Sequence, residues 1–432
     1  MKASFSVIAI LYLFSAHGSY ALPALIPGPA SGSQAGGVER PHYRRVKIFV
    51  PDREFLGRVW SAGLDFEGTT GKPGGWMEFI AGPEEIGALR ERGIPFEIAD
   101  EDPASSLAGQ LAPAPMDALG FGTGSMGGYY TLAEVEAQLD SMKLAYPALI
   151  TAKQAVGFSV AGRTIWGAKI SDNPDIAEAA EPEVLYTALI HAREPAGMMT
   201  VIYYMWWLLE HYGSDPRATY LVDNRQIWFI PVINADGYVY NESTNPSGGG
   251  LWRKNRRNNG NGTFGIDLNR NFGPDEMWNA PNGGSSTSTG SDTYRGPNPF
   301  SEPETQTLDA FMRLHEIRTC LNYHTHGRLL IYPYGYLSAE SGDSLIYREF
   351  AFDMARTNRH ATGTDLQTVH YSTRGNSDDF MYGDTTKFRT YAMTPEVGSS
   401  FWPASGLILP LAVENLEANI HYSMVAGAMA VI

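Results

Sequence analysis

Residues 181–194 read EPEVLYTALIHARE, and this stretch decides the fold that the sequence predicts. Its apolar run, 184–190, is unbroken, which is typical of a strand buried on both faces of a sheet. The run ends at His191, and Glu194 follows three residues later. Both side chains can turn toward one point, and imidazole nitrogen and carboxylate oxygen are both zinc ligands. The same residues also suit a surface ion pair, so the pattern needs support from the rest of the chain.

Three further apolar runs are interpreted as buried strands. They cover residues 226–233, 318–324 and 389–396, and helical patterns occur at 132–146 and 197–212. Buried strands separated by helices predict an α/β fold in which helices cover both faces of the sheet.

The ends of these strands carry residues that could react. Three of the four predicted strands end at or next to His191, His324 and Glu396, and open α/β sheets bind ligands beyond the carboxyl ends of their strands. A catalytic zinc needs a third protein ligand and one open position. His324 and His326 are both candidates, and because side chains alternate along a strand, spacing alone does not choose between them.

Polar clusters follow downstream. Residues 252–257 (WRKNRR) suit a solvated loop, and 267–271 (DLNRN) suit an Asx-rich turn. Buried arginine, however, binds carboxylates through two parallel hydrogen bonds, and a peptide C-terminus is a carboxylate. The clusters therefore also indicate an anchor for a chain end. Glu396 is either a buried ion-pair partner or a general base.

The N-terminus predicts export. Lys2 precedes an apolar run at 5–14, and small residues end at Ala21, which together are typical of a secretory signal peptide over 1–21. The alternative is a membrane anchor, but the run is shorter than the ~20 residues that a spanning helix needs. Cys320 is the single cysteine, so no intramolecular disulfide forms, and we expect a secreted or periplasmic bacterial enzyme.

A small domain is predicted before the main one. Residues 43–100 show a β-α-β-α-β order, typical of a small α/β or α+β domain, and 100–128 are rich in Ala, Pro, Gly and Ser, which predicts an exposed linker. We interpret 22–118 as a pro-segment and 119–432 as the catalytic domain; the alternative is a permanent accessory domain. The net charge of −15 disfavours nucleic acid as a partner, because phosphate binding needs a basic face.

From about residue 129 onward, the chain resembles the zinc carboxypeptidases of the carboxypeptidase A/B type, especially the bacterial branch represented by carboxypeptidase T. The matching blocks occur in family order: EPEVLYTALIHARE, WFIPVINADGY, LWRKNRR, GIDLNRNFG, YRGPNPFSEPET, NYHTHGRLLIYPYG, SDDFMYG and the strand ending at Glu396. The resemblance implies a mixed, mostly parallel sheet between helices and one zinc ion. It also implies an exopeptidase that acts on peptide or protein C-termini.

The resemblance assigns roles residue by residue. His191, Glu194 and His324 match the zinc ligands, because counting back from LLIYPYG selects His324 over His326. Asp267 matches a carboxylate that orients His191, an arrangement usual for zinc histidines. We expect His326 to line the cleft.

The remaining roles concern substrate and catalysis. Arg256 matches the arginine that polarises the scissile carbonyl, and Glu396 matches the general base. Asn269 and Arg270 match the anchor of the terminal carboxylate, and Tyr371 matches the mobile tyrosine that closes over substrate.

Further cleft residues bear on specificity. Arg193 and Arg253 match cleft arginines. Aligning residues 375–379 (GNSDD) puts Asp378 at the base of the side-chain pocket, which predicts a preference for C-terminal Lys or Arg. Asn376 departs from the glycine of animal members. The alternative is that Asp378 faces solvent in a turn.

Two other functions are compatible with the sequence. One is a zinc hydrolase of cell-wall peptides, which the complete carboxylate anchor disfavours. The other is an inactive peptide-binding module, although no ligand or base is missing here. We expect the pro-segment to be a partner of the catalytic domain, and no membrane span once the leader is removed. No residue pattern predicts a calcium site, although calcium stabilises loops in some bacterial relatives.

Overall fold

A mixed β-sheet forms the centre of the computed structural model, which describes residues 42–65, 69, 71–111 and 120–428. Among these residues the sheet has eight strands in the order β10-β9-β11-β8-β6-β7-β5-β4. The four central strands, β11, β8, β6 and β7, run parallel, and antiparallel pairs join β5 to β7, β4 to β5 and β9 to β11. The strands are β4 (Gln154–Phe158), β5 (Thr164–Ile170), β6 (Glu183–Ala188), β7 (Gln226–Ile230), β8 (Ile317–Tyr323), β9 (Leu329–Ile331), β10 (Ala361–Gly363) and β11 (Tyr391–Glu396).

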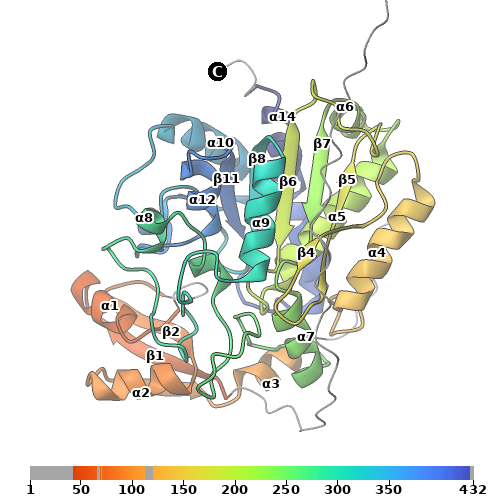
Figure 1. Ribbon diagram of the computed structural model, residues 1–432. Helices are drawn as coiled ribbons and strands as arrows, with labels where there is room; N and C mark the ends of the chain where they lie inside the picture. The colour runs from red at the N-terminus through yellow and green to blue at the C-terminus, as the bar shows by residue number, and fades with distance from the viewer. Residues whose placement is uncertain (1–41, 66–68, 70, 112–119, 429–432) are drawn as a thin grey trace, which may run out of the picture. The chain divides into compact units, whose positions relative to one another are not determined.

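Helices cover both faces of this sheet (Figure 1), as the sequence predicts. Side chains alternate along β6, so Tyr186 packs in the apolar cluster that includes α5 and α14, while Leu185 packs in the cluster that includes α9. The helices of this part are α4 (Leu132–Ala145), α5 (Pro195–His211), α6 (Pro216–Asn224), α7 (Ala235–Thr244), α8 (Asp275–Trp278), α9 (Pro303–Leu314), α10 (Ser344–Asn358), α11 (Asp365–Thr368), α12 (Ser377–Gly383), α13 (Ile408–Glu414) and α14 (Leu416–Val425), with 3₁₀ turns η1 (Leu268–Arg270) and η2 (Ser405–Leu407). None of the described helices is long and apolar enough to cross a membrane.

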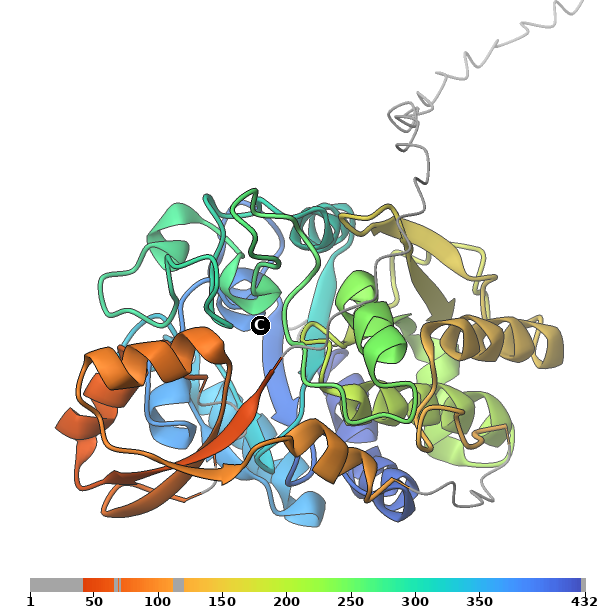
Figure 2. The same ribbon diagram turned by 90° about the horizontal axis from the view of Figure 1, so that it is seen from below.

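A second, three-stranded sheet belongs to residues 44–108, which we call the N-terminal subdomain. Its strands are antiparallel in the order β2-β1-β3, and helices pack against them in the predicted β-α-β-α-β order (Figure 2). The elements are β1 (Arg44–Val50), α1 (Arg53–Trp60), β2 (Gly75–Ala81), α2 (Pro83–Glu91), β3 (Glu97–Asp100) and α3 (Pro103–Ala108). The fold-class prediction is therefore confirmed in both parts.

The exposed linker predicted over 100–128 is wrong over much of its length. Asp102 caps α3 by accepting a hydrogen bond from the Ser105 backbone, and Leu107 of that helix is buried. Phe121 and Met126 are buried as well. Small residues permit tight packing as readily as flexibility, so composition did not distinguish the two. Residues 112–119 and the predicted leader lie outside the described residues.

The strand register brings the predicted reactive residues to one edge. Ala188 of β6 pairs with Tyr323 of β8, and an isolated bridge pairs His324 with Glu396. Because β6, β8 and β11 are parallel neighbours, the segments that follow them leave the sheet side by side.

Candidate active site

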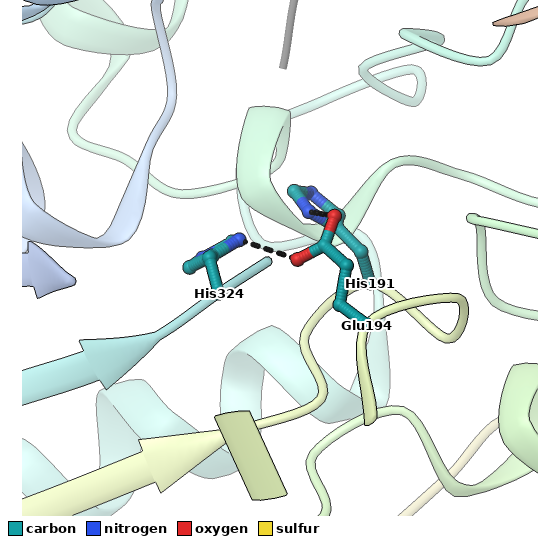
Figure 3. Close-up of side chains that lie close together, drawn as sticks. All are labelled: His191, Glu194 and His324. Atoms are coloured by element: carbon teal, nitrogen blue, oxygen red, sulfur yellow. Dashed lines mark hydrogen bonds and ion pairs between the residues drawn. The ribbon is translucent and has the colours of Figure 1, made fainter. Parts of the chain in front are cut away.

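Three polar side chains converge where β6 and β8 end (Figure 3). Glu194 stands at the N-terminus of α5, and its Oε1 lies 2.9 Å from Nδ1 of His191. Its Oε2 lies 2.9 Å from Nδ1 of His324. All three residues are buried, and their ligand atoms lie within 4.8 Å of one another. We call this group the His–Glu–His triad.

The triad fits a zinc ion by its donor set and its charge. Two imidazole nitrogens and one carboxylate oxygen are the ligands of a catalytic zinc that keeps one open position. Burial raises the pKa of Glu194, but His191 and His324 outweigh it and hold that pKa at about 2. The Nδ1 atom of His324 faces Glu194, and its buried Nε2 has no hydrogen-bond partner among the described residues.

The carboxylate of Asp267 supports His191 from behind. Its Oδ1 lies 3.2 Å from Nε2 of His191, and its Oδ2 accepts hydrogen bonds from Arg253 at 2.9 and 3.1 Å. Burial raises the pKa of Asp267, but the charges of Arg253, Arg270 and His191 lower it well below its usual range. A carboxylate on the far nitrogen orients the ring so that Nδ1 points toward Glu194 and the metal position, as is usual for zinc histidines.

Glu396 lies beside the triad at the end of β11. It pairs with His324 across the two strands, and the backbone N–H groups of His324 and Val397 bond the carbonyls of Pro395 and His324. The side chain is 2% exposed. It lines a small pocket, which we call the Glu396 pocket, formed by Asn269, Ile331, Tyr332, Pro333, Gly335, Asp365, Asn376, Asp378, Asp379, Thr394 and Glu396.

Asp378 is buried in this pocket, so the alternative in which it faces solvent is wrong. Its Oδ1 accepts a hydrogen bond from Nδ2 of Asn322 at 2.6 Å, and its Oδ2 accepts one from Thr394 at 2.6 Å. Burial raises its pKa to about 6, although both hydrogen bonds lower it. The anchor residues lie nearby: Asn269 lines the same pocket and accepts a hydrogen bond from the Ser377 backbone.

Arg270, next to Asn269, is 1% exposed, and its Nη1 donates to the Asn269 carbonyl at 2.7 Å. Two other arginines meet the N-terminal subdomain. Asp65 accepts hydrogen bonds from Nη2 of Arg193 at 2.5 Å and from Nη1 of Arg253 at 2.7 Å. Nη1 of the same Arg253 lies 3.9 Å from Oε1 of Glu194, so a carboxylate of the subdomain reaches the arginine that borders the triad.

Tyr371 and Arg256 stand in apolar and aromatic surroundings. Tyr371 is 8% exposed and packs in the apolar cluster of the N-terminal subdomain. The guanidinium carbon of Arg256 lies 3.7 Å from the ring centre of Tyr240, with two more aromatic rings within 4.8 Å. Burial lowers the pKa of Arg256.

His326, the rejected third-ligand candidate, packs against the ring of Phe401 with 4.9 Å between centroids. Both residues line a cavity whose other wall includes Arg45 and Phe79 of the N-terminal subdomain. Burial lowers the pKa of His326 to about 4. His326 therefore lines the space beneath the subdomain.

Sequence reasoning missed three acidic residues at the site. Asp65 had no motif around it, and only the tertiary structure brings it to Arg193. Asp365 and Asp379 line the Glu396 pocket. The pair Asp378–Asp379 is visible in the sequence, but strand and helix patterns do not reveal which of two adjacent carboxylates turns inward.

Comparison with known proteins identifies the class as a metal-dependent peptide-bond hydrolase. The zinc carboxypeptidase family model matches residues 135–418. The chain therefore belongs to the zinc carboxypeptidase family, whose members use zinc and act on peptide C-termini.

Relatives match over most of the chain. A zinc carboxypeptidase of Saccharothrix mutabilis subsp. capreolus is 29% identical over 419 residues, covering 92% of this chain and 93% of the relative. Carboxypeptidase A2 of Rattus norvegicus is 31% identical over 295 residues, covering 66% and 67%. The structure of carboxypeptidase A from Helicoverpa armigera shares the fold, with a TM-score of 0.75 and 23% identity over 91% of this chain and 99% of that one.

Glu85 of α2 lies where the N-terminal subdomain meets the rest of the chain. Its Oε1 accepts a hydrogen bond from the Asp292 backbone at 3.1 Å, and the Asp292 side chain binds Tyr43 at 3.1 Å and Arg193 at 3.2 Å. Burial and the charge of Asp292 raise the pKa of Glu85 to about 8. The protonated carboxyl is therefore the form that suits this contact.

Stability should fall as the pH rises. A carboxyl whose pKa is raised in the folded state contributes its full stabilisation below its ordinary pKa of 4.5 and loses it as the pH approaches 8. We expect the melting temperature of the intact chain to drop between pH 5 and 8, and Glu85→Gln, which mimics the protonated form, to flatten this slope. Glu84→Gln is the control and should keep the slope. Equal slopes in both variants would show that Glu85 is not responsible.

Proposed function

We propose that this chain is an exported zinc exopeptidase that removes C-terminal Lys or Arg from peptides and is made as a pro-enzyme. The observation that carries the proposal is one pocket that contains Glu396, Asn269 and Asp378 and adjoins the His–Glu–His triad through the His324–Glu396 pair. The pocket thus brings together a general base, an anchor for the terminal carboxylate and an anion that suits a cationic side chain.

The chemistry assigns a step to each residue. Zinc, when held by the triad, supplies a Lewis acid that acidifies water and polarises a carbonyl. Glu396 accepts a proton from the attacking water and delivers it to the departing amine. Arg256 stabilises the negative charge that develops on the carbonyl oxygen; this role requires its guanidinium to leave the aromatic rings that surround it.

Binding of the chain end makes the reaction exo rather than endo. Asn269 and Arg270 hold the terminal carboxylate, and Tyr371 covers the bound residue. Arg193 and Arg253 border the cleft on the side that Asp65 occupies. These side chains position the substrate so that its last peptide bond lies next to Glu396.

The first experiment uses two peptides that differ only in a C-terminal Arg or Phe. The intact chain, and the chain cleaved within the alanine-containing segment 112–118, are incubated with each peptide, with and without a zinc chelator. Products are read by mass spectrometry. We expect the cleaved chain to release Arg in a chelator-sensitive way. The Glu396→Gln variant should hydrolyse the peptide about 10² to 10⁴ times more slowly, because the proton acceptor is removed.

Zinc content is the control in the same preparations. Glu396→Gln should retain one zinc per chain, since Glu396 is not in the triad. Turnover that survives chelation, or full activity of the variant, would refute the mechanism. A zinc-loaded protein that removes neither residue would favour the cell-wall hydrolase alternative.

Asp378 should determine side-chain preference. Replacing it with Asn removes the charge, while the amide oxygen can still accept from Asn322 and the amide N–H can donate to the Thr394 hydroxyl. The ratio of kcat/KM for Arg over Phe should therefore fall at least about tenfold. Asp384→Asn is the matched control, because Asp384 is also buried and caps the other end of α12 without lining the pocket. An unchanged ratio in Asp378→Asn would remove Asp378 from the specificity site.

The pro-enzyme proposal rests on contacts of the N-terminal subdomain. Asp65 pairs with two cleft arginines, and Tyr371 packs in the subdomain's apolar cluster. Through these contacts the subdomain occupies Arg193, Arg253 and Tyr371, which the proposed mechanism assigns to substrate. Export rests on the leader predicted for residues 1–21.

Weakening the Asp65 contact should activate the intact chain. Asp65→Asn leaves the guanidinium groups of Arg193 and Arg253 with less charge compensation from the subdomain. We expect the uncleaved variant to hydrolyse peptides at least about ten times faster than uncleaved wild type, measured by the release of C-terminal residues. Glu54→Gln, an exposed change in α1, is the control. Equal rates for intact Asp65→Asn and wild type, when the cleaved wild type is active, would contradict an inhibitory role for Asp65.

A further inference from the structure

The loop that joins α11 to α12, residues 369–376, carries the tyrosine assigned to cover the bound substrate, and we call it the Tyr371 loop. Its end nearest α12 is fixed by backbone contacts, because the Phe272 N–H donates to the Gly375 carbonyl at 2.9 Å. Tyr371 itself packs in the apolar cluster of the N-terminal subdomain. That contact is lost when the subdomain leaves the cleaved chain, so the position of Tyr371 then depends on supports within the catalytic part.

Arg374 ties the Tyr371 loop to a second loop, residues 280–285, which follows α8 and which we call the Gly284 loop. Its Nη1 donates to the Ala280 carbonyl at 2.6 Å, and its Nε donates to the Ser285 hydroxyl at 2.7 Å. Its Nη2 donates to the Ser285 carbonyl at 3.4 Å. Because the guanidinium is planar and rigid, these bonds let one side chain hold both ends of the Gly284 loop.

The two loops also meet through bare backbone at Gly284. This residue is buried and has a φ of +104°, which glycine adopts without strain. A Cβ atom at this position would lie 2.5 Å from the Ser372 carbonyl oxygen and 2.6 Å from Cα of Thr373. The Tyr371 loop therefore lies directly on the Gly284 loop over the two residues that follow Tyr371.

Bonds within the catalytic part anchor the Gly284 loop. The backbone N–H of Ser286, directly after the loop, donates to the Thr293 carbonyl at 2.9 Å, and the Arg295 N–H donates to the Ser286 carbonyl at 3.0 Å. Gly283 also approaches the ring of Trp60 in the N-terminal subdomain. Since the backbone bonds do not involve the subdomain, this support for the Tyr371 loop persists when the subdomain leaves.

We propose that Arg374 is a positioning residue for Tyr371, holding the Tyr371 loop against the Gly284 loop so that the phenol covers a bound C-terminal residue. The inference rests on the proposed exopeptidase function, which assigns Tyr371 to substrate. A loose loop has to be ordered each time a substrate binds, and the entropy lost in ordering it weakens binding. Arg374 removes part of that cost by ordering the loop beforehand. Its role therefore concerns binding of the chain end and not the proton transfers at Glu396.

The test compares wild type, Arg374→Ala and Arg374→Lys as full chains cleaved within segment 112–118 and loaded with zinc. The substrates are the peptides ending in Arg and in Phe, and kcat and KM are measured separately. We expect Arg374→Ala to raise KM about tenfold for both peptides, with kcat within about threefold of wild type, because the lost support affects binding and not chemistry. Arg374→Lys keeps a donor for one of the acceptors and should raise KM less. A kcat close to that of wild type also reports that each variant is folded.

Arg225→Ala is the matched control. Arg225 is a buried arginine whose guanidinium also makes three bonds to neighbouring segments, to the carbonyls of Asn224, Ser423 and Met424. It directly precedes β7, at the end of the parallel strands opposite the His–Glu–His triad. The KM of this variant should stay within about twofold of wild type.

A double variant separates positioning of Tyr371 from a general loss of structure. If Arg374 acts through Tyr371, then Arg374→Ala should change KM less than about twofold in a chain that already carries Tyr371→Ala. An equal rise in KM in both backgrounds would overturn the proposal, and so would an unchanged KM in Arg374→Ala alone. Either result would leave the proposed function standing. Wild type that releases neither C-terminal residue would overturn the proposed function itself.

Discussion

The buried carboxylate of Glu194 is the constraint on which the rest of the site depends. Its two oxygens face one imidazole from the segment after β6 and another from the end of β8. A buried anion is costly unless it has partners, so both strands must end in register beside it. The pairing of Ala188 with Tyr323 provides that register. The parallel centre of the sheet is thus the scaffold that lets one carboxylate meet two histidines.

Further charged side chains surround the His–Glu–His triad. Asp267 stands behind His191 and holds Arg253, and Arg253 in turn reaches Asp65 of the N-terminal subdomain. Each buried ion is matched by an opposite one nearby, which is the usual condition for burying charge. The Glu396 pocket differs in its lining, which contains the carboxylates of Asp365, Asp378, Asp379 and Glu396.

The sequence predicted the central strands well because their apolar runs are long and unbroken. The residues after β6, at the end of β8 and at the end of β11 were therefore placed correctly at one edge of the sheet. Strands β4, β5, β9 and β10 were missed; β4 is half exposed, and β9 and β10 have only three residues each. The linker prediction failed at α3 because Ala, Ser and Pro are compatible with a short capped helix as well as with an open chain.

The sequence by itself determined the class of fold, the HxxE pattern at His191 and Glu194, and the acid pair at 378–379, because these depend on residue type and local spacing. Only the tertiary structure decided that Asp378 is buried, that Asp365 shares its pocket, and that Asp65 meets Arg193 and Arg253. The contacts of Asp65 join segments more than a hundred residues apart. The approach of Asp365 to Asp378 depends on how α11 and α12 are oriented, which local sequence does not predict. Local periodicity carries no information about such distances, and packing between elements alone sets them.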